Sequence, residues 1–179
     1  MNIPNIITIF RIFLVPIFLL VFHSNMENRI LISGLIFLLA GFSDVLDGYI
    51  ARRFDMGSKL GAALDPFADK LMSFAVLISF AIGGLIPIWI IVLILVKEAI
   101  MIVGGFFLYF REENIVIPSN LSGKAATVGL YASVLSIALG LSKDISTTLL
   151  IITVVLNILA FINYFKIFIG MKEEHNPQA

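Results

Sequence analysis

The stretch that decides both the fold and the chemistry of this chain is DVLDGYIARRFDMGSKLGAALDPFAD, residues 44–69. It contains five aspartates, and four of them, Asp44, Asp47, Asp65 and Asp69, form a spaced pattern at the junction of two strongly apolar segments. A carboxylate at membrane depth is costly unless a cation or a hydrogen-bond donor compensates it. Four carboxylates packed close together would also repel one another. The pattern therefore indicates a site that holds positive charge, most simply a pair of divalent metal ions.

The composition indicates that this site belongs to an integral membrane protein. Of the 179 residues, 60% are hydrophobic and 13% are charged, whereas soluble domains carry roughly 25% charged residues. The formal net charge of zero says nothing about a nucleic-acid partner, but there is no basic run to suggest one, and we expect none. The chain has no cysteine, which excludes disulfides and thiolate metal sites.

The apolar segments predict an all-α fold with six transmembrane helices. A bilayer core requires about 20 apolar residues per helix. Six segments have about this length, and they are Ile6–Phe22, Ile30–Ala51, Leu60–Ile82, Ile86–Phe110, Leu121–Leu141 and Ile145–Ile169. We expect one membrane domain over residues 1–171 and a polar tail over residues 172–179. The recurrence of Asn5, Thr8 and Arg11 on one helical face predicts a short interfacial helical start.

The distribution of positive charge predicts the orientation of the helices. With both termini inside, the inner connections and the tail carry Arg52, Arg53, Lys59, Arg111, Lys124, Lys166 and Lys172. The outer loops then carry Arg29 and Lys143. This excess obeys the positive-inside rule. We therefore expect a multi-pass protein of the cell (plasma) membrane whose aspartates face the cytoplasm.

The spacing of the aspartates predicts a two-metal site. Asp44 and Asp47 are three residues apart, and Asp65 and Asp69 are four apart, so each pair shares a helical face. If the two helices form an antiparallel hairpin, both pairs can face one cavity. Oxygen-only ligands suit Mg²⁺ or Mn²⁺. Two such ions about 4 Å apart can stabilise the attacking and leaving oxygens of a phosphoryl displacement.

Small residues and one arginine accompany the aspartates: Gly48, Ala51, Gly61 and Arg52. The small residues would let a flat ring or a diphosphate approach the helix backbone, and the arginine can offer a bidentate fork to a phosphate. The alternative is that they pack helices together and that the arginine anchors the chain at the interface. Asn5 and Thr8 are further candidates for binding the donor molecule, again with interface anchoring as the alternative.

Together these positions match, without a gap, the pattern D-x2-D-G-x2-A-R-x8-G-x3-D-x3-D. In this pattern and in its six-segment layout, the chain resembles the CDP-alcohol phosphotransferase family over essentially its whole length. The resemblance implies that a CDP-linked lipid binds two metal ions, an alcohol attacks its phosphorus, and CMP leaves. It implies that Asp44, Asp47 and Asp65 are metal ligands, and that Asp69 contacts metal and also accepts the proton of the alcohol. It further implies that the small residues and the arginine accommodate the cytidine nucleotide, and that the protein is a homodimer.

The acceptor alcohol must be inferred from other positions. Residues 2–12 and 57–70 resemble bacterial phosphatidylglycerophosphate synthases, a branch of this family. That resemblance implies CDP-diacylglycerol as donor and glycerol 3-phosphate as acceptor. An anionic acceptor needs fixed cations, and the candidates are Lys124, Lys97 and Arg111. For Lys97 the alternative is an ion pair with its neighbour Glu98 inside the helix bundle.

Other readings of the same pattern remain open. Within the family, the acceptor could be phosphatidylglycerol, as in cardiolipin synthesis, or a head group such as serine or inositol phosphate. Outside it, a small cation carrier could also display carboxylates within the membrane. A carrier more often has an inverted repeat or helices broken at the midplane, whereas the acids here cluster on one predicted hairpin.

Overall fold

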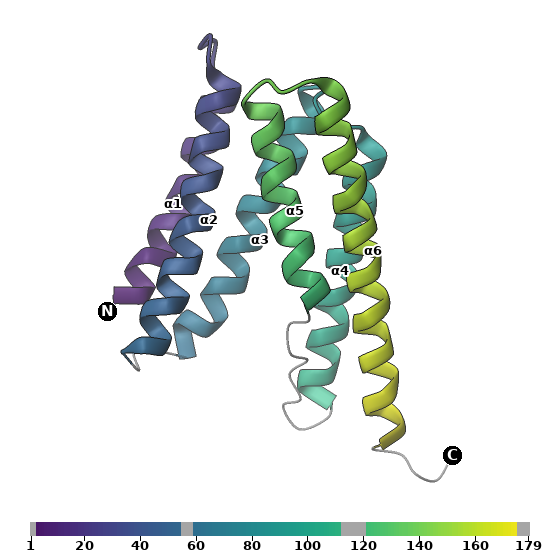
Figure 1. The fold of residues 1–179 in the computed structure, drawn as a ribbon. Coiled ribbons are helices and arrows are strands. Elements are labelled where there is room, and N and C mark those ends of the chain that lie inside the picture. The colour runs from purple at the N-terminus through teal and green to yellow at the C-terminus, as the bar shows by residue number, and fades with distance from the viewer. Residues whose placement is uncertain (1–2, 55–58, 112–120, 175–179) are drawn as a thin grey trace. The chain divides into compact units, whose positions relative to one another are not determined.

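The computed structural model describes the backbone of residues 3–54, 59–111 and 121–174, and the side chains of residues 4–54, 67–101, 103 and 121–166. All regular structure in these ranges is helical, which confirms the predicted all-α class. The helices are α1 (Ile3–Phe22), α2 (Arg29–Arg53), α3 (Lys59–Ile82), α4 (Ile88–Arg111), α5 (Leu121–Ala138) and α6 (Lys143–Glu174) (Figure 1). Each predicted segment coincides with one of them.

The two ends of the chain differ from the prediction. The expected interfacial start is not a separate element, because α1 runs unbroken from Ile3 to Phe22. Pro4 lies in its first turn, where a fixed φ is compatible with a helix and no intrahelical N–H is needed. At the other end, α6 continues to Glu174 and takes in the first three residues of the expected tail. These residues are lysine and glutamate, both good helix formers.

Four segments of the described residues are long and apolar enough to cross a bilayer. They are Pro4–Phe22, Arg29–Arg53, Leu121–Ala138 and Lys143–Lys166. They make this an all-helical membrane protein. Helices α3 and α4 both include residues outside the described side chains, and the crossing of the membrane by all six helices stays a prediction.

The chain divides into two compact units. One contains Met1–Pro87 together with Val134–Leu141, and the other contains Ile88–Ser133 together with Ser142–Ala179. Helix α5 is therefore shared, since its last residues belong to the first unit and the rest belongs to the second. The single membrane domain expected from the sequence stays a prediction.

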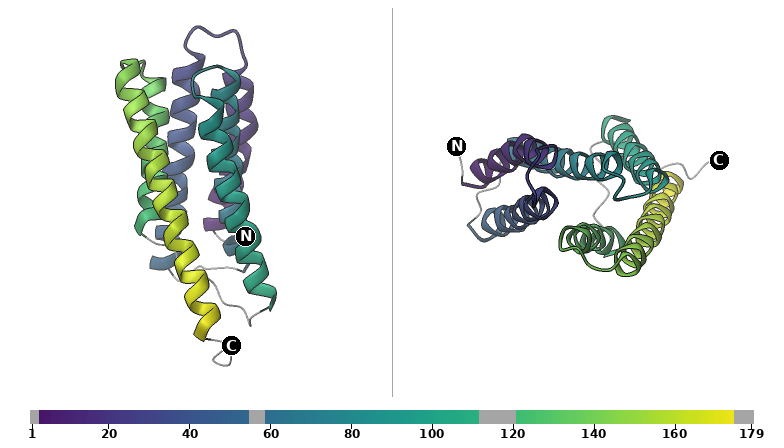
Figure 2. Two further views of the ribbon diagram at one scale, coloured as in Figure 1. Left: turned by 90° about the vertical axis from the view of Figure 1, so that its right-hand side faces the viewer. Right: turned by 90° about the horizontal axis from the view of Figure 1, so that it is seen from above.

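The first unit is organised around α1, which packs against both α2 and α3 (Figures 1 and 2). At one end, the ring of Phe22 stacks on those of Phe18 and Phe80, with centroids 5.8 Å and 5.3 Å away. Gly34 of α2 lies so close to the end of α5 that a Cβ there would be 2.3 Å from the Cβ of Ala138. This packing holds the polar face of α1 beside the half of α2 that carries its aspartates.

In the second unit, α6 is joined to α5 by hydrogen bonds between polar side chains. The hydroxyl groups of Ser133 and Thr153 lie 3.0 Å apart. The amide of Asn163 donates to the hydroxyl of Ser122 over 2.8 Å. Small and polar residues of this kind commonly join helices inside membranes, where the hydrophobic effect does not.

Candidate active site

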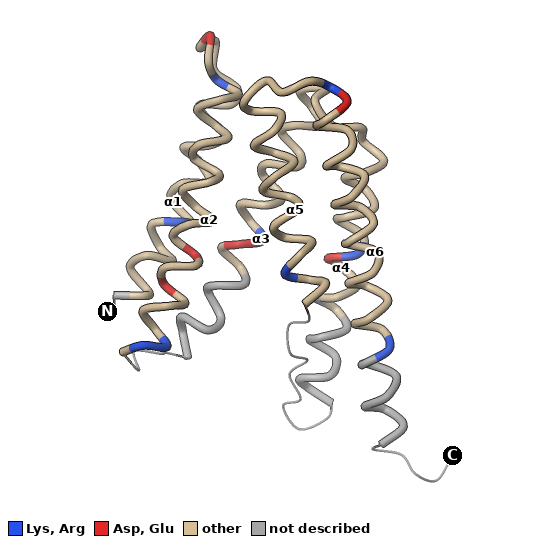
Figure 3. Tube along the Cα trace, viewed as in Figure 1, with Lys and Arg blue, Asp and Glu red and all other residues tan. Residues whose placement is uncertain are grey.

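Two of the predicted metal ligands, Asp44 and Asp47, lie on one face of α2 and point toward α1. They differ in exposure, since the side chain of Asp47 is 3% exposed and that of Asp44 is 42% exposed. In Figure 3 the acidic positions of α2 and the basic position of α1 lie at a similar level along the two helices. The structure therefore places one carboxylate inside the helix contact and the other at its border.

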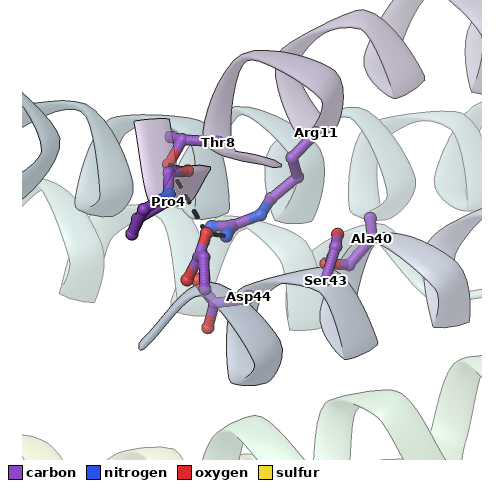
Figure 4. Close-up of polar contacts among 7 residues, drawn as sticks. Pro4, Thr8, Arg11, Ala40, Ser43 and Asp44 are labelled. Atoms are coloured by element: carbon purple, nitrogen blue, oxygen red, sulfur yellow. Dashed lines mark hydrogen bonds and ion pairs between the residues drawn. The ribbon is translucent and has the colours of Figure 1, made fainter. Parts of the chain in front are cut away.

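The cation between these carboxylates is Arg11 of α1. Its Nη1 contacts Oδ1 of Asp44 and its Nη2 contacts Oδ2 of Asp47 (Figure 4). Only 1% of Arg11 is exposed. A buried guanidinium without a partner would be strongly destabilising, and so would the buried carboxylate of Asp47. Each group therefore makes the burial of the other possible.

Thr8 supports the same carboxylate from one turn earlier on α1. Its hydroxyl lies 3.1 Å from the carbonyl oxygen of Pro4 and 3.4 Å from Oδ2 of Asp47, within reach of either acceptor. Thr8 is buried and Asn5 is half-buried. The expected polar face of α1 thus exists, and its Thr8 and Arg11 are turned toward α2.

The second pair of aspartates is only partly described. Asp69 of α3 is half-buried. Asp65 and Gly61 lie on α3 as well, but their side chains are outside the described residues. Among the described side chains, no three carboxylates or imidazoles lie close enough to hold one metal ion. The structure thus brings Asp44 and Asp47 together with Arg11, and the complete set of four aspartates stays a prediction.

The predicted nucleotide site has an open surface on α2. The guanidinium of Arg52 lies over Gly48, where an added Cβ would be 3.7 Å from Nη2 of the arginine. Arg52 is exposed, while Gly48 and Ala51 are half-exposed. Because Gly48 has no side chain, the backbone beside the guanidinium is accessible to a flat ring or a phosphate. The structure thus brings Arg52 close to Gly48 on α2, and the role of these residues toward a nucleotide stays a prediction.

Of the candidate acceptor cations, Lys97 is the one whose contacts are described. Its Nζ donates to Oδ1 of Asn157 over 2.9 Å and lies 2.6 Å from Oε1 of Glu98. Lys97 and Glu98 are both buried. Lys97 also lines a largely apolar cavity of about 600 Å³ between α4 and α6, together with Trp89 and Asn157. This geometry matches the alternative of an ion pair inside the bundle, here extended to a second helix.

The other two candidates are less defined. Lys124 is exposed on α5. Arg111 ends α4, and its side chain is outside the described residues. Both stay predictions as cations for the acceptor phosphate.

A sequence profile described as CDP-alcohol phosphatidyltransferase matches residues 1–159. The chain belongs to the CDP-alcohol phosphotransferase family. The match includes every position of the aspartate pattern, as well as Arg11, Lys97 and Lys124. The matched range therefore includes the residues that form the polar contact between α1 and α2.

Individual members of the family are similar in sequence to this chain over different parts of its length. A Mycobacterium bovis protein named as a candidate cardiolipin synthase is 34% identical over 140 residues, 78% of this chain and 66% of that protein. CDP-diacylglycerol–glycerol-3-phosphate 3-phosphatidyltransferase of Haemophilus influenzae is 47% identical over 77 residues, 43% of this chain and 42% of that protein. The enzyme of the same name from Aquifex aeolicus is 32% identical over 165 residues, 90% of this chain and 89% of that protein. The chain thus spans just under two thirds of the mycobacterial relative and less than half of the Haemophilus one.

The residues present fit the divalent metal ion that the family resemblance implies. Asp44 and Asp47 offer carboxylate oxygens from one helical face, and hard cations such as Mg²⁺ prefer such ligands. These two carboxylates need a positive charge close by, and in the structure the buried guanidinium of Arg11 supplies it. The side chain of Asp44 is also partly exposed outside the contact between α1 and α2.

We expect Lys97→Met to lower the free energy of unfolding by about 3–5 kcal/mol, because it leaves Glu98 as a buried charge without its cation. The double variant Lys97→Met, Glu98→Gln should lose less than the single one. Thermal unfolding of the purified protein in detergent measures both. Lys143→Met, at an exposed lysine at the start of α6, is the matched control. Equal losses in the single and double variants would contradict the ion-pair role.

Sequence reasoning noted Arg11 on the polar face of α1 and missed it as the partner of the aspartates. A signal was available, since an arginine inside an apolar segment needs a counter-charge. The first span contains no acidic residue, and the second contains only Asp44 and Asp47. Asn157 was missed in the same way as the second partner of Lys97.

Proposed function

We propose that the protein is a metal-dependent CDP-diacylglycerol–glycerol-3-phosphate 3-phosphatidyltransferase. It transfers a phosphatidyl group from CDP-diacylglycerol to glycerol 3-phosphate and releases CMP. The observation that carries this proposal is the similarity to the Aquifex enzyme of that name, which extends over 90% of this chain and 89% of the relative. The complete aspartate pattern of residues 44–69 supports the same reaction class.

In the proposed site, Asp44, Asp47, Asp65 and Asp69 hold two Mg²⁺ or Mn²⁺ ions. When bound, such ions neutralise the diphosphate of the donor and stabilise the oxygens that attack and leave. Asp69 accepts the proton of the acceptor hydroxyl as a general base. The acceptor oxygen forms a bond to the phosphorus on the lipid side, and the bond from that phosphorus to the oxygen of CMP breaks.

The remaining residues bind and orient the substrates. Gly48, Ala51 and Gly61 leave room for the cytidine nucleotide, and Arg52 pairs with a phosphate through its planar fork. Thr8 and Asn5 lie on the α1 face beside this region. Because Thr8 is buried within reach of Asp47, it acts on the donor through that carboxylate.

For the phosphate of the acceptor, Lys124 and Arg111 are the proposed cations. Lys97 is already engaged by a carboxylate and an amide, both inside the second unit. A third partner for its ammonium would have to displace one of these. We therefore assign Lys97 to holding α4 and α6 together.

The proposal includes a place in the cell. Six transmembrane helices with both termini inside would put the aspartates at the cytoplasmic face of the plasma membrane, where the excess of lysine and arginine supports this orientation. The homodimer belongs to the same proposal and is supported by the family resemblance. The surrounding membrane lipids are then both the solvent of the protein and the source of its donor.

A second acceptor is favoured by one specific observation. The Mycobacterium bovis relative is named as a candidate cardiolipin synthase and matches 78% of this chain. With phosphatidylglycerol as acceptor, the metal site and the release of CMP would be the same. Only the pocket for the acceptor would differ, since it would need to admit a second lipid.

We expect the purified protein in detergent to release CMP from CDP-diacylglycerol when Mg²⁺ and glycerol 3-phosphate are both present. Release of CMP and formation of the lipid product are measured in parallel, with phosphatidylglycerol, serine and inositol phosphate as competing acceptors. Release that depends on glycerol 3-phosphate is the expected result. Release only with another acceptor would keep the reaction class and overturn the substrate, and a lack of release with every acceptor would contradict the proposed enzyme.

A further inference from the structure

Arg11 occupies the two carboxylates that the proposed function assigns to a metal ion. Its two terminal nitrogens contact two different aspartates of α2, Asp44 (Figure 4) and Asp47. The guanidinium therefore bridges Asp44 and Asp47 in the same way that a bound cation would. The single positive charge of Arg11 thus contacts both carboxylates.

The two contacts are not equivalent. Oδ2 of Asp47 contacts the guanidinium of Arg11 and also lies 3.4 Å from the hydroxyl of Thr8. The side chain of Asp47 is 3% exposed. The side chain of Asp44 is 42% exposed, so its contact with Arg11 lies at the border of the helix pair. Water and dissolved ions can therefore approach Asp44 more easily than Asp47. Replacing the guanidinium at Asp44 is also cheaper than at Asp47, because solvent screens the partly exposed carboxylate of Asp44.

A guanidinium and a divalent ion repel each other when they share one carboxylate. The oxygens of Asp44 have lone pairs for more than one partner, but two cations a few ångströms apart raise the energy of both, and more so away from water. Binding of metal must therefore weaken the hold of Arg11 on the pair.

We propose that Arg11 is the resident counter-ion of the metal-ligand pair: it holds Asp44 and Asp47 together, yields Asp44 to the divalent ion, and retains its contact with Oδ2 of Asp47 while that carboxylate also serves the metal site. Arg11 is thus a positioning residue that competes with the metal at one carboxylate and orients the other. The inference rests on the metal dependence in the proposed function. Binding of the metal ion would then depend on α1, a helix that contributes none of the four predicted metal ligands.

The test measures binding of Mn²⁺ to the full chain in detergent, by the electron paramagnetic resonance signal of the free ion and without any lipid substrate. We expect Arg11→Gln to bind Mn²⁺ at least about tenfold more tightly than the unaltered protein, because the substitution removes a buried positive charge that competes with the ion, and such charges are poorly screened. We also expect Arg11→Gln to melt at a lower temperature without metal and to regain most of the loss when Mn²⁺ saturates it. Arg29→Gln, at an exposed arginine of the same unit, should change neither measurement.

If Arg11→Gln does not fold, Arg11→Lys takes its place. Lysine keeps the charge but not the fork, so it can hold one carboxylate at a time. Its affinity for Mn²⁺ should rise by a smaller factor, with a smaller loss of melting temperature. Unchanged or weaker Mn²⁺ binding in these variants would overturn the inference, and so would a loss of stability that Mn²⁺ does not restore.

The inference and the proposed function fail in different experiments. Mn²⁺ binding in the absence of donor and acceptor does not depend on which alcohol the enzyme uses. Protein that releases CMP with glycerol 3-phosphate, but whose Arg11 variants bind Mn²⁺ as the unaltered chain does, would overturn the inference alone. Protein that shows the Arg11 effect on Mn²⁺ but releases no CMP with any acceptor would overturn the proposed function alone.

Discussion

Asp69→Asn is expected to abolish CMP release in a protein that remains folded. Asparagine has nearly the shape of aspartate, so the half-buried position on α3 can accommodate it. It cannot accept the proton of the acceptor hydroxyl, and general-base catalysis alone contributes about 10²- to 10⁴-fold to a rate. The weaker hold on a metal ion adds to the loss. Single-turnover release of CMP, measured with the melting temperature of the same preparation, tests this.

The control for Asp69→Asn removes a carboxylate elsewhere. Asp144 is exposed in the first turn of α6, and Asp144→Asn should leave CMP release unchanged. Appreciable turnover by Asp69→Asn would sink the assignment of Asp69 as the base. A melting temperature far below that of the unaltered protein would instead attribute the loss of activity to the fold.

Asp47→Ala is expected to lower the free energy of unfolding by about 3 kcal/mol, near the lower end of the cost of breaking a buried ion pair. The substitution leaves Nη2 of Arg11 facing a gap that water does not reach, while Nη1 keeps Asp44. Asp44→Ala should cost about 1 kcal/mol or less, because that side chain is 42% exposed and solvent screens it. Both variants should lose CMP release.

Stability is measured here by thermal or detergent-induced unfolding of the two variants side by side. Asp44 and Asp47 are matched controls for each other, since they share a helix, a partner and a predicted role. A difference in stability with similar losses of activity is the expected pattern. Equal stabilities would contradict the view that α1 buries one carboxylate and leaves the other at the border.

The sequence could predict the helices because length and apolarity are local properties. Each predicted segment coincides with one helix, and only the positions of the helix ends differ from the prediction. The end of α6 moved because Lys172 to Glu174 favour a helix although they are polar. The start of α1 moved because Pro4 is compatible with a first turn. Polarity marks where a chain leaves the membrane, and it does not by itself mark where a helix stops.

The candidate site was predictable where spacing decides it and not where packing does. The shared face of Asp44 and Asp47 follows from a separation of three residues. Their contact with Arg11 joins positions more than thirty residues apart, and it depends on which side of α1 meets α2. The same holds for Lys97, whose neighbour Glu98 was foreseen and whose partner Asn157 on α6 was not. A charged residue inside an apolar segment indicates that it needs a partner. Only the packing of the helices determines which residue that partner is.

The burial of Arg11 also has a consequence for the order in which the protein is made. Helix α1 is synthesised before α2 and contains no acidic residue, so nothing within that helix can neutralise its arginine. The counter-charges arrive with α2, after the ribosome has added the rest of the hairpin. An arginine at the centre of a membrane helix opposes insertion by about 2.5–3.5 kcal/mol. We therefore expect the first helix to be stable in the bilayer only once the second has supplied the counter-charges.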